Sequence, residues 1–121
     1  MTKTQALFSF WNGFNLPAYD ETTVPENAPF PRLTFEAAED AFGHEIALTA
    51  SVWDYSTSWS VVEQKAAEIG QRITMGGIAV PYEGGVMWLK RGTPFAQRMA
   101  DDNDSVRRIV INLSAEFISQ D

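Results

Sequence analysis

His44 is the natural place to look for catalysis, because it is the only histidine in the chain. A histidine next to a serine or cysteine nucleophile can act as its general base, but no such nucleophile motif accompanies His44. A usual zinc site needs several histidine or cysteine ligands, and the chain contains no cysteine. His44 is expected beside a turn, where a solvated side chain without a catalytic role is the ordinary interpretation.

The acidic run at residues 101–104 (Asp-Asp-Asn-Asp) offers oxygen ligands of the kind that calcium prefers. An EF-hand loop also requires a glycine at its sixth position and a closing bidentate glutamate, and the run has neither. A solvated acidic loop is therefore the better interpretation. Ion pairs with Arg98, Arg107 or Arg108, within one chain or across an interface, are the alternative.

Two further patterns fail as catalytic or phosphate sites. Neither the Gly-Gly pair at residues 76–77 nor the one at 84–85 is followed by the Gly-Lys-Ser/Thr of a phosphate loop. Glu36, Glu39 and Asp54 could form an acid/base pair, but their alternation suits a solvent-facing strand edge better. The sequence therefore predicts no enzyme, no cofactor and no metal site.

Aromatic and basic side chains are the remaining candidates for function. Several tryptophans and a tyrosine could line a ligand pocket, although tryptophan more commonly lies in a core or an interface. We predict a protein–protein interface instead. Its residues are Trp53, Tyr55, Trp59, Arg98, Arg107 and Arg108.

The chain that must position these side chains has 121 residues, the size of one domain, and 45% of them are apolar. We therefore treat residues 1–121 as a single domain with a packed core. No apolar run approaches the roughly 20 residues of a membrane span, and no secretory signal is recognisable. We expect neither membrane insertion nor export.

The net charge of −7 is distributed unevenly along the chain. Residues 1–60 contain eight acids and two bases, whereas residues 61–121 contain eight acids and seven bases. Nucleic-acid binding requires clustered lysine and arginine to neutralise phosphates, so this balance argues against it.

The N-terminal third is expected to form a helix followed by an irregular segment. Leu7, Phe10, Trp11 and Phe14 follow the spacing of an amphipathic helix over about residues 4–14. Residues 15–31 contain four prolines, which favour extended chain. This segment is either an arm that reaches a neighbouring subunit or a surface crossover.

The remaining elements follow from alternation and turn signals. Strands are predicted at residues 32–39 and 45–55, joined as an antiparallel hairpin. A helix follows from about Ser60 to Ile73, with Ser60 and Glu63 at capping-box spacing. A third strand or hairpin is expected over residues 78–90, a loop with one helical turn over residues 92–105, and a last strand over residues 106–118.

These elements predict an α+β fold with a mainly antiparallel sheet of about four strands. Their order is helix, strand, strand, helix, strand, strand, and both helices are expected to pack on one face of the sheet. The opposite face is expected to carry Thr49, Ser51, Trp53, Arg108 and Asn112, a mixture that is common in subunit contacts.

Three segments carry a resemblance to a known family. They are the proline-entered strand at residues 31–36, the strand end at residues 50–56 with its Val-Trp pair, and the amphipathic helix that runs to Ile73. In this order they resemble the tail terminator, or tail-completion, proteins of long-tailed bacteriophages and prophages. The strand from Arg107 to Phe117 also fits that pattern, so the resemblance covers nearly the whole chain.

The resemblance implies a structural virion protein rather than an enzyme. It implies a homo-oligomer, a hexameric ring, that caps the tail tube and contacts the head-tail connector proteins. It would assemble in the cytoplasm of the host bacterium and then remain in the neck of the virion. The acidic groups of residues 20–45 or 101–104 could line the channel of the ring and keep DNA from adhering.

Other interpretations predict different partners. Another neck protein, a head-completion protein or connector adaptor, would share the size, the acidity and the ring. A small-ligand-binding α+β domain would use the tryptophans as a pocket and would stay monomeric or dimeric. A small enzyme is the weakest alternative, because the polar constellation that it needs is missing.

Overall fold

The computed structural model describes residues 1–37 and 45–119. Its elements, in chain order, are α1 (Lys3–Trp11), a 3₁₀ turn (Asn12–Phe14), β1 (Ala18–Asp20), β2 (Arg32–Phe35), β3 (Glu45–Tyr55), α2 (Ser60–Ile73), β4 (Ile78–Tyr82), β5 (Gly85–Met99) and β6 (Val106–Ser119). His44 and Glu39 fall outside the described residues.

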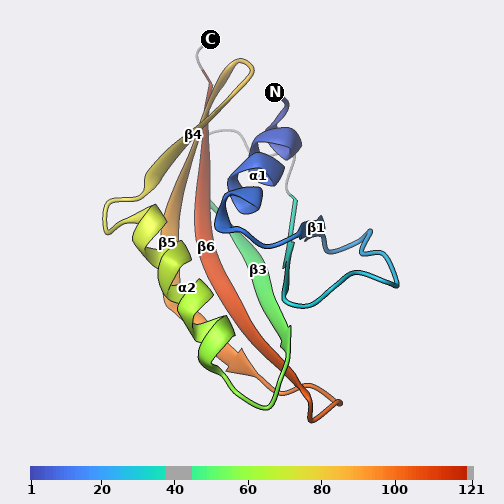
Figure 1. Ribbon diagram of the computed structural model, residues 1–121. Helices are drawn as coiled ribbons and strands as arrows, with labels where there is room; N and C mark the ends of the chain where they lie inside the picture. The colour runs from blue at the N-terminus through green and yellow to red at the C-terminus, as the bar shows by residue number, and fades with distance from the viewer. Residues whose placement is uncertain (38–44, 120–121) are drawn as a thin grey trace.

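The predicted fold class is wrong in the number, the order and the arrangement of its strands. Within the described residues, one six-stranded sheet has the order β1-β2-β3-β6-β5-β4. It is mixed, because β1 pairs with β2 in parallel while the other neighbours are antiparallel. The long strands curl into a half-barrel rather than a flat layer (Figure 1).

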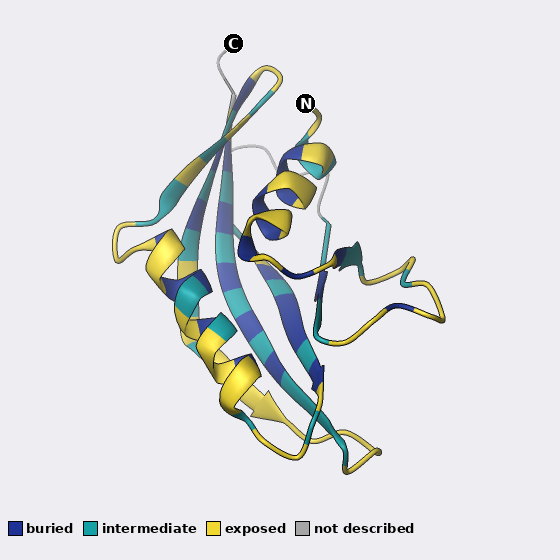
Figure 2. Ribbon diagram, in the orientation of Figure 1, coloured by how far each residue is buried: buried dark blue, intermediate teal, exposed yellow. Residues whose placement is uncertain are grey.

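The inner face of the half-barrel holds the core. Leu48, Ala50 and Val52 of β3 lie opposite the buried Leu113, Ile111 and Ile109 of β6. This alternation is what places one side of each strand in the core and the other toward solvent. Figure 2 shows it as bands of buried and less buried residues along both strands.

Helix α1 lies across the open side of the half-barrel. It contacts β4 at one edge of the sheet and β1 at the other. Its stripe of Leu7, Phe10 and Trp11 is buried, as predicted. A capping box begins the helix, because the Thr2 hydroxyl accepts from the Gln5 amide and the Gln5 side chain accepts from the Thr2 amide.

Helix α2 packs over β3, β6 and β5. Its predicted apolar stripe is confirmed, since Val62, Ala66, Ile69 and Ile73 are all buried. The predicted capping box is wrong. The N-cap is Trp59, which makes no side-chain cap hydrogen bond.

The hairpin expected over residues 78–90 is present as β4 and the first part of β5. Strand β1, within the proline-rich segment, was not expected, and β5 is longer than expected, because it continues through the predicted loop to Met99. The register between β5 and β6 shifts between Arg91 and Ala96, so the Gly-Thr-Pro-Phe stretch is an irregularity inside one strand rather than its end. Within the described residues, no helix is long and apolar enough to cross a membrane.

Candidate assembly surfaces

The predicted interface residues separate into two groups on different faces of the sheet. Trp53 and Arg108 form the first group, on the outer face, and they are direct cross-strand partners in β3 and β6. The Arg108 guanidinium lies 4.5 Å from the Trp53 ring, and its Nε donates to the Ser51 hydroxyl at 3.1 Å. The Trp53 Nε1 donates to the Thr34 hydroxyl at 3.0 Å. Both polar ends of this pair are therefore held in place.

Aromatic side chains extend the outer group toward the proline-rich segment. Tyr55 is 60% exposed and packs against Phe30, whose ring centroid is 6.0 Å from its own. Arg32 lies over Phe30 at 4.1 Å and donates from Nη1 to the Ala28 carbonyl at 2.9 Å. Phe30 and Arg32 were not among the predicted interface residues.

The second group lies where α2 begins. Trp59 contacts two guanidinium groups, Arg98 at 4.5 Å and Arg107 at 5.4 Å from its ring centroid. Arg98 comes from the end of β5 and Arg107 from the start of β6, so three elements meet at one indole. Cation–π contacts of this kind are worth roughly 0.5–1 kcal/mol at exposed positions.

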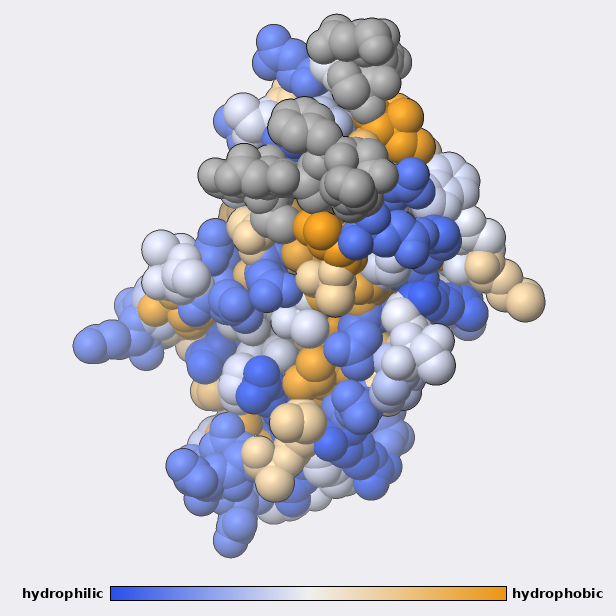
Figure 3. Space-filling view, turned by 180° about the vertical axis from the view of Figure 1, so that it is seen from behind, coloured by the Kyte–Doolittle hydropathy of each residue, from blue (hydrophilic) through white to orange (hydrophobic). Residues whose placement is uncertain are grey.

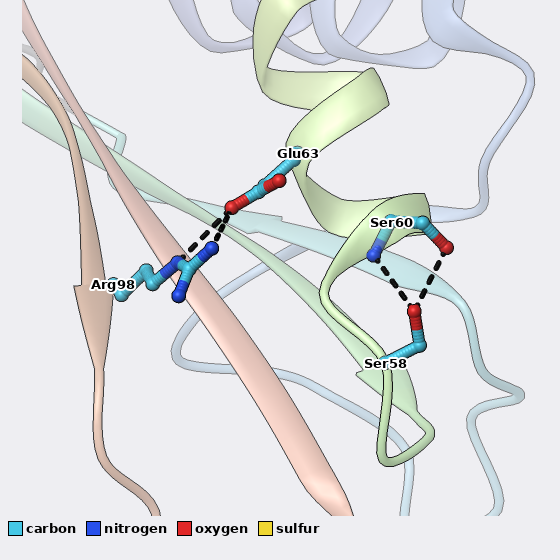
Figure 4. A network of polar contacts seen from close by, with 4 residues as sticks. All are labelled: Ser58, Ser60, Glu63 and Arg98. Carbon is cyan, nitrogen blue, oxygen red and sulfur yellow. Dashed lines mark hydrogen bonds and ion pairs between the residues drawn. The ribbon is translucent and has the colours of Figure 1, made fainter.

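An ion pair fixes the orientation of Arg98. Its Nε donates to Glu63 Oε1 at 3.0 Å, and its Nη2 donates to the same oxygen. Figure 4 shows Glu63 on α2 reaching across to Arg98 on β5, with Ser58 and Ser60 bonded to each other at the helix start. Glu63 was predicted to cap the helix; instead it ties the helix to the end of β5.

The acidic run forms a hydrogen-bonded loop. The Asp101 carboxylate accepts from the Asn103 amide, and the Asn103 side chain accepts from the Ser105 amide, each at 2.9 Å. Arg107 contacts this loop through the backbone, donating to the Asp104 carbonyl at 2.7 Å. Among the described residues, no ion pair joins a carboxylate of residues 101–104 to Arg98, Arg107 or Arg108.

Two of the carboxylates that could have formed an acid/base site, Glu36 and Asp54, are among the described residues, and they lie on different faces of the sheet. Glu36 accepts from the Thr49 amide at 3.0 Å and so supports the sheet. Asp54 is buried on the inner face. No group of three or more His, Cys, Asp or Glu residues in the described ranges could hold a metal ion.

Two surface groups have clearly shifted pKa values. Hydrogen bonding and charge attraction from Glu45, 2.6 Å away, raise the pKa of Lys90 above its ordinary value. The backbone amide and then the hydroxyl of Thr22 lower the pKa of Asp20 by donating to its carboxylate. Both shifts belong to local surface contacts.

The hollows of the described surface are open. One, about 780 Å³, follows α1 and is lined by Met1, Thr4, Gln5, Phe8, Ser9, Asn12 and Gly13. Another, about 500 Å³, lies on the outer face of the sheet beside the irregularity in β5. Figure 3 shows that outer face, with apolar residues running down its middle between hydrophilic flanks.

Comparison with solved structures identifies this fold in a chain from the virion of a native gene transfer agent particle. The two agree with a TM-score of 0.61 over 92% of this chain and 83% of that one, at 17% identity. A second solved protein, whose name states no function, agrees with a TM-score of 0.52 over 95% and 88% of the two chains, at 16% identity. No family model and no curated protein matches the sequence. At these identities, the chain shares a fold with a component of a virion particle.

Proposed function

We propose that this protein is a structural subunit of a phage-like virion, and specifically a tail terminator. In this role it forms a hexameric ring that caps the finished tail tube and presents a surface to the head-side connector. The observation that carries the proposal is the fold shared with a gene transfer agent virion chain over 92% of this chain. The resemblance of residues 31–36 and 50–56 to tail terminators supports the finer assignment.

Binding rather than chemistry is the activity that the side chains support. A ring of identical subunits needs two different surfaces on each copy, because each copy meets its neighbours head to tail. The Trp53–Arg108 pair on the outer face and the Trp59–Arg98–Arg107 group at the start of α2 supply aromatic and arginine side chains, which are enriched in interfaces. We therefore retain all six predicted residues, Tyr55 included, as interface candidates.

The first test is the mass of the protein in solution. Light scattering after size exclusion, over a concentration series, is expected to give six times 13.5 kDa, with rings visible by negative staining. Mixed with purified tail tubes, the protein is expected to bind at the tube ends only. A monomer at every concentration that also ignores tail tubes contradicts the proposal.

A pull-down separates this role from that of another neck protein. Immobilised protein is incubated in parallel with tail tubes and with portal complexes. A terminator is expected to retain the tubes, whereas retention of the portal alone identifies a head-completion protein or connector adaptor. The host cytoplasm during assembly and the neck of the finished virion are the corresponding locations.

Acidic groups give the ring a second expected property. If residues 101–104 or residues 20–45 face the channel, the carboxylates repel the phosphates of passing DNA. The assembled ring is expected to show no DNA binding at physiological salt in a mobility-shift assay. Retarded DNA at that salt concentration contradicts the channel assignment.

A further inference from the structure

One edge of the sheet has an unpaired stretch of backbone at the end of β5. Strand β4 pairs with β5 only as far as the Ile78–Leu89 pair, whereas β6 pairs with β5 as far as the Met99–Arg108 pair. Among the described residues, no other strand lies against Ala96–Met99, and those four residues are exposed. The far end of β5 is seen as an exposed ribbon beside α2 in Figure 2. An unpaired strand edge is a template for an added chain segment.

Two cations of β5, Arg91 and Arg98, lie beside this edge. Arg91 donates to the Gly70 carbonyl and Arg98 is ion-paired to Glu63, but the Arg98 side chain remains 56% exposed and can bind a second carboxylate. A hollow of about 350 Å³ opens beside the edge, between α2 and β5. Its lining combines small apolar residues with Phe95 and the Arg91 side chain: Ala66, Ala67, Gly70, Gln71, Arg91, Phe95 and Ala96.

The opposite end of the same sheet carries the complementary charge. Strand β1 is the other edge strand, and the segment that continues from it to β2 projects away from the body of the protein (Figure 1). Residues 18–31 contain Asp20, Glu21 and Glu26 and no base, and one guanidinium, that of the next residue Arg32, lies over Phe30. From Glu21 to Glu26, five of the six residues are exposed. We call residues 18–31 the acidic arm.

We propose that the acidic arm of one copy seats against the β5 edge of the next copy. The contact joins two different surfaces at opposite ends of one sheet, so it is head to tail and continues from copy to copy. This contact rests on the proposed hexameric ring and specifies which two surfaces join neighbouring subunits in that ring. The arm's carboxylates lie against Arg91 and Arg98, and its apolar residues fill the hollow lined by Phe95.

The same contact assigns different roles to the two acidic segments. Residues 18–31 are covered by the neighbouring copy, so they do not line the channel. The loop at residues 101–104 remains free to do so. Electrostatic complementarity of this kind selects the partner and the register of the contact more than it sets the affinity.

Cysteine cross-linking tests the contact directly, because the wild-type chain contains no cysteine. We would prepare Thr23→Cys in the arm, Ala96→Cys at the β5 edge, and the double variant. Mild oxidation of the double variant is expected to give a covalent ladder on non-reducing gels, up to the full ring. A mixture of the two single variants is expected to stop at dimers. The matched control is the double variant Thr23→Cys with Met75→Cys, because the Met75 side chain is 94% exposed and lies outside the proposed contact.

The outcomes separate this contact from the function on which it rests. Rings that form without a ladder overturn the contact and leave the terminator proposal standing. A ladder on open chains, with no closed ring and no binding to tail tubes, supports the contact and overturns the terminator proposal. A chain that stays monomeric with tail tubes present overturns both.

A charge reversal provides a second, independent readout. Glu26→Lys is expected to weaken self-association at least about tenfold, because it places a cation against Arg91 and Arg98 of the neighbour. Glu83→Lys, at an exposed position in the turn between β4 and β5, is the control with the same change of charge. Sedimentation equilibrium measures both variants, and equal association constants for the two overturn the contact.

Discussion

At the scale of single residues, two helix starts carry a capping-box pattern in the sequence, and only one of them forms the box. Ser60 and Glu63 have capping-box spacing, yet Ser60 is already helical and Glu63 bonds Arg98. Thr2 and Gln5 have the same spacing and do form the box. The pattern Thr-x-x-Gln at residues 2–5 was visible in the sequence. The difference between the two sites is a tertiary contact, because Glu63 bonds Arg98, which is 35 residues away in the chain.

A pair of substitutions tests this difference. Thr2→Ala is expected to lower the free energy of unfolding by about 0.5–2 kcal/mol, because it removes the acceptor for the Gln5 amide. Ser60→Ala is expected to change it by less than about 0.5 kcal/mol, as for most exposed positions. Urea denaturation followed by tryptophan fluorescence measures both. Equal losses of unfolding free energy in the two variants would mean that the capping box at α1 does not stabilise the protein.

The Asp20 carboxylate gives a prediction in pH. Its pKa lies below the ordinary 3.8 because the Thr22 amide and hydroxyl donate to the ionised form. This contribution to stability is present above the unfolded pKa and is lost as the pH falls through the folded one. Thr22→Val removes the hydroxyl donor and keeps the amide donor. The pKa of Asp20, followed by carboxyl NMR, is expected to rise in the variant and to remain below 3.8. No rise would assign the shift to the amide alone.

At the scale of elements, alternation and helical spacing predicted the parts of the fold that have one buried face. The observed bounds of β3, Glu45–Tyr55, are those predicted, and the apolar stripes of both helices are buried. The antiparallel pairing of β2 and β3 is confirmed as well. These elements are determined by local periodicity, which a single sequence displays.

Strand β1 and the second part of β5 escaped prediction for physical reasons. Strand β1 has three residues, too few for an alternating pattern. In β5, Gly92 and Pro94 indicate a loop, but the chain accommodates them at the register shift between Arg91 and Ala96. The Arg91 guanidinium, which donates to the Gly70 carbonyl at 3.0 Å, holds this irregular part of the strand against α2. Long-range contacts of this kind leave no local signal.

Two glycines in the β4–β5 region provide a matched test of backbone constraint. Gly77 has φ +92°, and a Cβ there would lie 2.7 Å from the Leu89 carbonyl oxygen. Gly84 has φ +91°, and a Cβ there would meet nothing within 4 Å. Gly84→Ala is expected to cost roughly 1–2 kcal/mol from the left-handed backbone alone. Gly77→Ala is expected to cost more, because the clash adds to the same strain, and thermal unfolding ranks the two. Equal midpoints would show that the backbone near Leu89 yields easily.

At the scale of the whole molecule, the sequence predicted the six candidate interface residues as one set, and the structure divides them into two groups. Trp53 and Arg108 meet because β3 and β6, far apart in the chain, are neighbours in the sheet. Trp59, Arg98 and Arg107 meet on the inner face, and no pattern in the sequence separates them from the first pair. The strand order of the sheet is what places the acidic arm and the basic β5 edge at opposite ends.

Salt is expected to act on assembly rather than on folding. Exposed opposite charges are screened beyond about 8 Å at physiological ionic strength and beyond about 3 Å at 1 M. The association constant, measured by sedimentation from 50 mM to 1 M sodium chloride, is therefore expected to fall, while the unfolding midpoint of the monomer changes little. An association constant that rises with salt would indicate an apolar contact instead.

The central position of β6 has a consequence for biosynthesis. This strand is the last of the six to leave the ribosome, yet it lies between β3 and β5 and pairs with both. The edge of β3 that pairs with β6 therefore stays unpaired while more than fifty further residues, from Tyr55 to Val106 and beyond, are synthesised. Pairing between such distant segments is slow. The sheet therefore cannot close until β6 has left the ribosome, and the unpaired edge of β3 is exposed to aggregation until then.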